Sequence, residues 1–213
     1  MTVRLGLVDS GLPAEQAVAR SFTGGAVSVD HLGHGTAISQ VICHHAPTIA
    51  LYNAQVFDGR GVTTARAVAE AIDWLVAEKV DLINLSLGLA QDRAILAAAC
   101  GRAVDAGTIV IAASPARGAA TYPASYPGVI RATGDARCAV DEISFLDSAQ
   151  ADFGGCPRGM DRDTGLQIGG ASFGTAHISG QLAAYLLAGG DKNSVRDWLV
   201  SRAKYIHNER RTK

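Results

Sequence analysis

Excess charge of either sign, clustered cysteines and long apolar runs are all missing from this sequence of 213 residues. The formal net charge is −1 at pH 7, so no electrostatic excess draws the chain to nucleic acid or to an anionic membrane. No stretch reaches the roughly 18 to 20 apolar residues that a membrane-spanning helix needs. Neither nucleic acid nor membrane is therefore expected as a partner.

Cysteine is scarce, with four residues in the whole chain and no CxxC pair. This spacing excludes a zinc knuckle and a thioredoxin-like motif. We expect four free thiols that serve as small hydrophobic side chains in a reducing cytoplasm. They are Cys43, Cys100, Cys138 and Cys156.

The N-terminus also has too short an apolar run for a signal peptide, and a candidate catalytic residue, Asp9, follows almost at once. The composition, 48% hydrophobic and 18% charged, is ordinary for a globular protein. We therefore expect a single cytoplasmic domain over residues 1–213, with no signal peptide or propeptide, that folds unaided.

What the sequence does contain is an alternation of short β-branched runs and helical periodicity. The runs suit strands buried on both faces, and they cover residues 3–8, 26–29, 49–56, 80–85, 108–113 and 129–133. Helices are expected at 34–42, 64–78, 91–106, 172–187 and 193–204. This alternation predicts an α/β fold with three α/β/α layers and a mostly parallel sheet. Ligands bind beyond the carboxyl ends of such strands, where Asp9 and Ser86 fall.

The segment Gly170-Ala171-Ser172-Phe173-Gly174 places a serine between glycines at the start of a predicted helix. The pattern fits the nucleophile elbow of α/β-hydrolases, in which an acid and a histidine follow the serine along the chain. Only a short tail follows Ser172 here, and its candidate partners are few: Asp191, Asp197 and His207. The elbow interpretation is therefore poorly supported.

Better partners precede the serine. A serine hydroxyl needs a histidine to take its proton and an acid to fix that histidine's tautomer, and the chain offers them in the order Asp9, His34, Ser172. The segments Val8-Asp9-Ser10-Gly11, Asp30-His31-Leu32-Gly33-His34-Gly35-Thr36-Ala37 and 170–180 resemble the aspartate, histidine and serine motifs of the subtilisin-like serine proteases, the subtilases. The resemblance extends over residues 3–187.

This resemblance implies a subtilisin-like fold and a serine endopeptidase that uses no cofactor and acts on a peptide or protein. Ser172 would attack the scissile carbonyl, His34 would act as general base and then acid, and Asp9 would orient His34. The residues Ser86, Leu87 and Gly88 look like the family's substrate-lining strand, which pairs with the substrate backbone as an added β-strand. The backbone N–H of Ser172, at a helix N-terminus, would form part of the oxyanion hole.

One departure from the family concerns the rest of that oxyanion hole. Subtilases usually carry an asparagine there, and the corresponding position in Ala112-Ala113-Ser114-Pro115-Ala116-Arg117-Gly118 aligns with Ala116, which has no side-chain donor. Three alternatives stay open: a slow but specific enzyme, a hole completed by Ser114, Arg117 or another group, or a catalytically impaired pseudoprotease that binds peptides. The intact Asp9, His34 and Ser172 favour an enzyme.

Two further expectations concern metals and the substrate. His31, His34, His44 and His45 with Asp30 suggest a ligand cluster, but a helix through Ser39 separates His34 from His44, so no metal is expected. The family's calcium loops have no clear counterpart. The small size resembles that of processing subtilases, which implies an intracellular enzyme that removes a leader peptide from a precursor.

Overall fold

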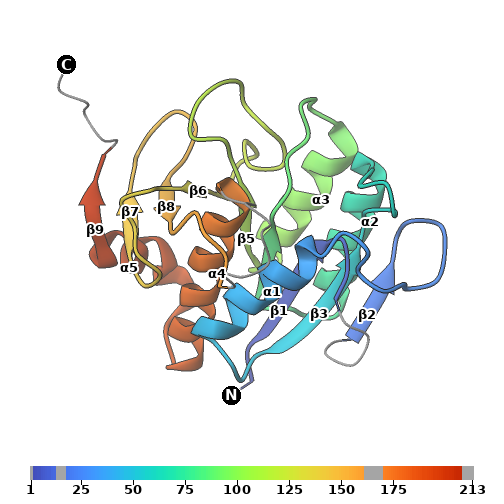
Figure 1. The fold of residues 1–213 in the computed structure, drawn as a ribbon, viewed down its shortest axis with the longest axis horizontal. Coiled ribbons are helices and arrows are strands. Elements are labelled where there is room, and N and C mark those ends of the chain that lie inside the picture. Colours follow the sequence, from blue (N-terminus) through green and yellow to red (C-terminus); the bar gives the residue numbers. More distant parts are fainter. Residues whose placement is uncertain (1, 13–17, 161–169, 208–213) are drawn as a thin grey trace.

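The computed structural model describes residues 2–12, 18–160 and 170–207, and its centre is a nine-stranded sheet within these ranges. The strands run in the order β2-β3-β1-β4-β5-β6-β8-β7-β9, and every pairing is parallel except that of β7 with β8 (Figure 1). The strands are β1 (Arg4–Asp9), β2 (Val18–Ser21), β3 (Ala50–Gln55), β4 (Leu82–Leu85), β5 (Ile109–Ala113), β6 (Ile130–Gly134), β7 (Ile143–Phe145), β8 (Phe153–Gly155) and β9 (Ala203–Ile206).

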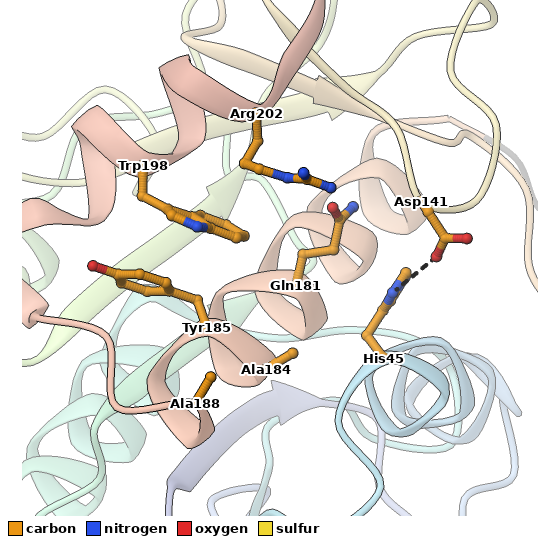
Figure 2. A pocket seen from close by; sticks show the side chains of 8 residues that line it. All are labelled: His45, Asp141, Gln181, Ala184, Tyr185, Ala188, Trp198 and Arg202. Carbon is orange, nitrogen blue, oxygen red and sulfur yellow. Dashed lines mark ion pairs between the residues drawn. The ribbon is translucent and has the colours of Figure 1, made fainter.

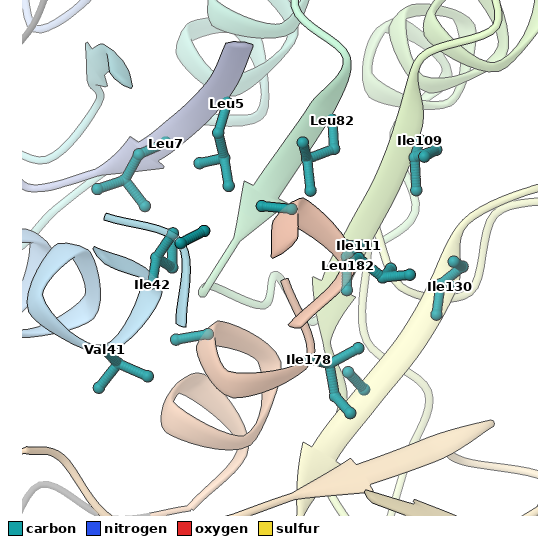
Figure 3. Close-up of a cluster of buried hydrophobic side chains, with 14 of the residues drawn as sticks. Leu5, Leu7, Val41, Ile42, Leu82, Ile109, Ile111, Ile130, Ile178 and Leu182 are labelled. Atoms are coloured by element: carbon teal, nitrogen blue, oxygen red, sulfur yellow. The ribbon is translucent and has the colours of Figure 1, made fainter. Parts of the chain in front are cut away.

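Five α-helices cover both faces of the sheet in the described part of the chain (Figure 1). They are α1 (His34–His45), α2 (Ala65–Ala77), α3 (Ala94–Asp105), α4 (Ala171–Leu187) and α5 (Val195–Arg202), the last preceded by a short 3-10 turn, Lys192–Ser194. One buried cluster joins the sheet to α1, α4 and α5, and Figure 3 shows how Leu5 and Leu7 of β1 face Ile42 of α1 and Ile178 of α4. The second cluster joins the opposite face to α2 and α3. The predicted three-layer α/β/α fold is confirmed.

The direction in which the sheet grows changes beside β1. Strands β3 and β2 lie on one side of β1, and β4 to β9 lie on the other. In open α/β sheets, ligands bind at such a reversal, in the crevice beyond the carboxyl ends of the strands. The ends that flank this crevice are Asp9, the last residue of β1, and Ser86, which follows β4 directly.

The helices begin and end where local chemistry favours it. The side chain of Thr64 caps α2 by accepting a hydrogen bond from the N–H of Ala67 at 3.1 Å. The helix α3 ends at Asp105, and Gly107 just beyond it has a φ of 76°, the left-handed conformation that glycine adopts without steric cost. The predicted helices at 34–42, 64–78, 91–106 and 172–187 are confirmed, with ends that differ by up to three residues.

One sequence prediction is wrong, and one helix is shorter than predicted. No strand forms at 26–29, because Val27 and Val29 are exposed and the N–H of Ser28 donates to Oε1 of Gln55, a side chain, at 3.0 Å. The sheet edge is instead β2, eight residues earlier. The helix predicted at 193–204 does form, as α5, but it ends two residues early at Arg202, since the following residues alternate in burial and pair with β7 as β9.

The four cysteines are free thiols, as expected; Cys43 is half-buried and the other three are buried. Within the described part of the chain, none of the helices combines the length and the apolar content that crossing a bilayer requires.

Candidate active site

Asp9 lies at the carboxyl end of a strand that is hydrogen-bonded on both sides, and its side chain is fully buried. Its Oδ1 accepts the N–H of Ser10 at 2.7 Å and the hydroxyl of Ser10 at 3.2 Å. These bonds hold the carboxylate in one orientation at the carboxyl end of β1. Without such partners, a buried charge at this position would be costly.

His34 is the first residue of α1, and its Nδ1 lies 2.7 Å from Oδ1 of Asp9. The two residues can come this close because Gly35 follows the histidine: a Cβ at Gly35 would lie 2.2 Å from the carbonyl oxygen of Gly11. The glycine therefore lets the start of α1 pack directly against the turn that follows β1.

Asp30 fixes the loop that leads into α1. Its Oδ1 accepts the hydroxyl of Ser10 at 2.8 Å and the N–H of Gly33 at 2.9 Å. Its Oδ2 accepts both the N–H and the hydroxyl of Thr36, at 2.8 and 2.7 Å. Because the first N–H groups of a helix have no partner within the helix, this carboxylate caps α1 and ties His34 to the Asp9 turn.

The pKa of His34 is raised above its ordinary value of 6.5. Burial lowers this pKa, but the hydrogen bond that Nδ1 of His34 donates to Asp9 and the negative charges of Asp9 and Asp30 together outweigh the effect of burial. The environment thus favours the imidazolium cation, which a histidine acting as general base must form.

Ser172 is the second residue of α4, and it lies beside the strand end that carries Ser86. Its hydroxyl donates to the carbonyl oxygen of Ser86 at 3.0 Å, and the hydroxyl of Ser86 donates to the carbonyl oxygen of Ser172 at 3.1 Å. The helix start reaches this position because Gly174 packs on β6, where a Cβ would lie 2.0 Å from the carbonyl oxygen of Thr133.

A buried chain of hydrogen bonds supports the contact between Ser172 and Ser86. The hydroxyl of Ser179 donates to Oδ1 of Asn84 at 2.9 Å, and Nδ2 of Asn84 donates to the hydroxyl of Ser86 at 2.9 Å. The chain links α4, β4 and the carbonyl of Ser172 through three side chains. Sequence reasoning missed Asn84 and Ser179, although polar residues in otherwise apolar segments are a signal for such networks.

A cleft of about 240 Å³ opens beside these residues. It is lined by Asp9, His34, Ser86, Leu87 and Gly88 together with Ser10, Leu32, Phe57, Gly61, Thr63 and Leu89. Ser172 adjoins this cleft through its pair of bonds with Ser86. Among the described residues no hydrogen bond joins Ser172 to His34, since the serine hydroxyl donates to Ser86 instead.

The segment after β5 holds the groups considered for the oxyanion hole. Ala116 and Arg117 are exposed in a turn. Ser114 is buried, and its hydroxyl donates to the carbonyl oxygen of Gln150 at 2.6 Å, so its single hydrogen is already engaged. The donors that the structure leaves without a partner inside α4 are the N–H groups of its first turn, including that of Ser172.

The histidines do not form a metal site with one another in the part of the chain that the structure describes, where no group of three or more potential ligands is found. His45 lies at the far end of α1 from His34, and its Nε2 is 2.8 Å from Nδ1 of His177. His177 contacts the carbonyl oxygen of Arg158 through Nε2 at 2.9 Å. His34 and His44 stand near opposite ends of α1, so the helix separates these two residues as predicted.

Comparison with known proteins gives a family-level match over most of the chain. The model of the subtilase family matches residues 18–212. The minor extracellular protease Epr of Bacillus subtilis is 29% identical over 145 positions, which cover 60% of this chain and 22% of that protein. A subtilisin of Bacillus pumilus is 28% identical over 235 aligned positions, which cover 96% of this chain and 84% of that protein.

Two solved structures share the fold. A cold-adapted subtilisin-like serine proteinase superposes with a TM-score of 0.70 at 21% identity, over 97% of this chain and 86% of that one. The prenylagaramide maturation protease PagA gives a TM-score of 0.66 at 20% identity, over 93% of this chain and 82% of that one. At these identities the similarity establishes the arrangement of strands and helices.

Proposed function

The chain belongs to the subtilase family of serine endopeptidases, and on that premise we propose that it hydrolyses peptide bonds through Asp9, His34 and Ser172. The observation that carries the proposal is the 2.7 Å contact of His34 with the buried Asp9, in a cleft that Ser172 adjoins through Ser86. These three side chains come from β1, α1 and α4, and all lie near the carboxyl ends of the central strands.

The proposed reaction begins with the hydroxyl of Ser172. Rotation about the Cα–Cβ bond turns its proton from the carbonyl of Ser86 towards Nε2 of His34, while Asp9 holds the proton on Nδ1. The serine oxygen bonds to the scissile carbonyl carbon as its proton moves to His34. The tetrahedral intermediate then releases the amine, which takes that proton, and an acyl-enzyme remains. Water repeats the sequence with His34 as base and frees Ser172.

Negative charge on the intermediate requires donors in place before the reaction. The N–H of Ser172, in the first turn of a 17-residue helix, supplies one donor and the positive end of the helix dipole. With Ala116 at the usual asparagine position, and the hydrogen of Ser114 engaged by Gln150, we propose that the enzyme is slow and selective.

The substrate that fits this proposal is an extended peptide paired along Ser86, Leu87 and Gly88, with apolar side chains against Leu32 and Phe57 of the cleft. We propose a precursor from which a leader peptide is removed. A maturation protease among the fold neighbours supports this assignment. The chain also resembles the small bacterial subtilase that trims the leader of the quinohemoprotein amine dehydrogenase γ-subunit, so that leader is the first precursor to test.

A fluorophosphonate probe tests the nucleophile. The folded wild-type protein should be labelled on Ser172, and Ser172→Ala should not be labelled. Ser125→Ala is the matched control, because Ser125 is exposed and bonds only to the carbonyl of Thr121, at 2.9 Å. Absence of labelling in folded wild-type protein would favour the second candidate, a peptide-binding pseudoprotease, for which the alanine at position 116 is the supporting observation.

Mass spectrometry of peptide-library products tests the substrate class. Wild type and Ser172→Ala are incubated side by side with the library, with casein and with a leader-bearing γ-subunit precursor. A processing enzyme should cut the precursor at one position and leave casein nearly intact. Broad digestion of casein without cleavage of the precursor contradicts the leader-peptide assignment and leaves the endopeptidase assignment in place.

We further propose that the enzyme acts in the cytoplasm, where its four thiols stay reduced. Fractionation of the producing cells, with cleavage assayed in each fraction, tests this assignment.

A further inference from the structure

A second pocket, of about 530 Å³, lies at the opposite ends of α1 and α4 from His34 and Ser172 (Figure 2). The length of α1 alone separates His45, on its rim, from His34 by about 16 Å. Its lining comes from α1, α4, α5 and the loop before β7: His45, Asp141, Gln181, Ala184, Tyr185, Ala188, Trp198 and Arg202. The pocket is therefore distinct from the cleft beside Ser172.

Two side chains that line this pocket, Gln181 and Arg202, carry hydrogen-bond donors without an acceptor in the described part of the chain. Gln181 is only 8% exposed, and its Nε2 is buried with no hydrogen-bond partner among the residues that the structure describes. A buried amide group without a partner is costly, which makes it a marker for a ligand. Arg202, the last residue of α5, extends its guanidinium towards this amide in Figure 2, and it forms no hydrogen bond or ion pair with any described residue. A cationic guanidinium beside an amide whose N–H groups have no acceptor among the described residues fits a carboxylate.

An apolar wall stands beside these donors. The rings of Tyr185 and Trp198 stack with centroids 4.7 Å apart and planes inclined by 27° (Figure 2). The hydroxyl of Tyr185 is occupied, since it accepts the N–H of Asp191 at 3.0 Å. Ala184 and Ala188 on α4 keep the base of the pocket open. The wall thus offers a ligand the faces of two aromatic rings, and the hydroxyl of Tyr185 is already engaged by Asp191.

An acceptor stands on the opposite rim. The carboxylate of Asp141 is 82% exposed and lies 3.6 Å from Nδ1 of His45. Its outward position leaves oxygens free to accept an N–H from a ligand. The pocket therefore presents donors, an apolar wall and an acceptor around one volume, a combination typical of small-ligand sites.

We propose that this pocket binds the C-terminal residue of a peptide whose last side chain is apolar. In such a residue the carboxylate, the side chain and the amide nitrogen are all attached to one Cα atom. The carboxylate would contact Arg202 and Gln181, and the apolar side chain would pack on the Trp198 wall. The amide N–H would donate to Asp141. An acidic side chain within a peptide supplies the carboxylate but only a short methylene stem for the aromatic wall. A volume of about 530 Å³ holds one or two residues and no larger element.

Trp198 reports on this binding, because the chain has two tryptophans and Trp74→Phe leaves Trp198 as the only indole. In that background, N-acetyl-L-phenylalanine should change the fluorescence of Trp198 saturably. N-acetyl-L-phenylalaninamide, which lacks the carboxylate, should bind at least tenfold more weakly. The α-amide of N-acetyl-L-glutamic acid, which carries its carboxylate on the side chain, should also bind at least tenfold more weakly.

Arg202→Gln and Gln181→Leu should each raise the dissociation constant of N-acetyl-L-phenylalanine at least tenfold. Arg66→Gln, which removes an exposed arginine from α2, is the matched control and should leave it unchanged. Circular dichroism establishes that each variant is folded. No saturable response, equal binding of the amide, tighter binding of the glutamic acid derivative, or an unaffected folded Arg202→Gln variant would each overturn the proposal. Because no cleavage step is measured, these outcomes are independent of whether Ser172 is catalytic.

Discussion

Asp9 holds Nδ1 of His34 at 2.7 Å with one carboxylate oxygen, while its other oxygen, Oδ2, is buried without a hydrogen-bond partner among the described residues. Its charge is therefore satisfied mainly by groups at Oδ1: the imidazole and the N–H and hydroxyl of Ser10. A buried carboxylate with so few donors gains most when the imidazole becomes a cation. The pair is thus built to stabilise a protonated His34.

The first prediction follows from this pair. Asp9→Asn keeps the shape of the side chain but presents an amide to Nδ1, which favours the wrong tautomer of His34. The value of kcat for a peptide substrate should fall by roughly 10³- to 10⁴-fold, with little change in KM. Steady-state kinetics measures both constants. Asp73→Asn, an exposed residue of α2 paired with Arg102, is the control and should keep wild-type kcat. A decrease in Asp9→Asn of less than tenfold would argue against the proposed role of Asp9.

The second prediction concerns the pH profile of kcat/KM. Only neutral His34 can accept the proton of Ser172, and its pKa is raised above 6.5, so activity should be lost as the pH falls through a value above 6.5. Asp30→Asn removes one of the charges that raise this pKa, so the acidic limb should move to lower pH. An acidic limb that stays in place in a folded Asp30→Asn variant would contradict the assignment of that limb to His34.

The third prediction separates the candidates for the oxyanion hole. Ala116→Asn supplies the amide donor that the family usually has, and kcat should rise. The upper bound is about 10²- to 10³-fold, the amount that loss of this asparagine costs in subtilisin itself. Ala119→Asn, an exposed neighbour, should have no such effect.

Ser114→Ala tests the remaining donor in the same assay. Because the hydroxyl of Ser114 donates to Gln150, kcat should change less than threefold. A loss of 10²-fold or more would instead identify Ser114 as the second oxyanion donor, released from Gln150 during the reaction.

The sequence predicted the core of this fold well because the central strands are short apolar runs and a helix such as α2 buries one stripe of its surface. The stretch 82–85 is buried at every position, and 68, 71, 72 and 75 form the buried face of α2. The edges were harder to predict. Val18–Ser21 is almost entirely exposed, and Ala203–Ile206 forms a strand only because β7 is present to pair with it.

The candidate active site likewise contains residues that the sequence predicts and contacts that it does not predict. Asp9, His34 and Ser172 stand in motifs with characteristic neighbours, so their positions could be predicted from local sequence. The bonds between Ser172 and Ser86, and the engagement of Ser114 by Gln150, join residues 86 and 36 positions apart. Such contacts depend on how strands and loops pack, which local periodicity does not encode. The same holds for the pocket of Trp198 and Arg202, whose lining is spread over the chain. Residues 161–169, which lead into the Ser172 motif, lie outside the described residues.

The fourth prediction concerns Gly174, the glycine that allows α4 to pack closely on β6. In Gly174→Ala the new Cβ would lie 2.0 Å from the carbonyl oxygen of Thr133, so helix and strand must separate. The free energy of unfolding should fall by about 1–3 kcal/mol. Gly101→Ala is the matched control, because Gly101 lies within α3 with nothing near the new Cβ. In this variant the free energy of unfolding should rise by about 0.5–1 kcal/mol. Urea unfolding followed by circular dichroism measures both values. Equal effects of the two substitutions would contradict the packing argument.

The fifth prediction links the buried histidine pair to stability in acid. Burial, with the charges of His177 and His44, lowers the pKa of His45 from 6.5 to about 4, although Asp141 opposes the shift. A histidine with a lowered pKa binds fewer protons in the folded state than in the unfolded state. Its contribution is therefore fully present above pH 6.5 and is lost as the pH falls towards 4.

For this one group the loss between pH 7.5 and pH 5 is about 2 kcal/mol. The burial of His177 lowers its pKa as well and adds to the loss. Denaturant titrations at the two pH values measure the difference. His45→Gln should be less stable than wild type at pH 7.5, because the bond to His177 changes, yet should lose less stability on acidification. His44→Gln removes an exposed ring from the same turn of α1 and should retain most of the wild-type loss. If His45→Gln loses as much stability as wild type, the acid sensitivity does not arise from this pair.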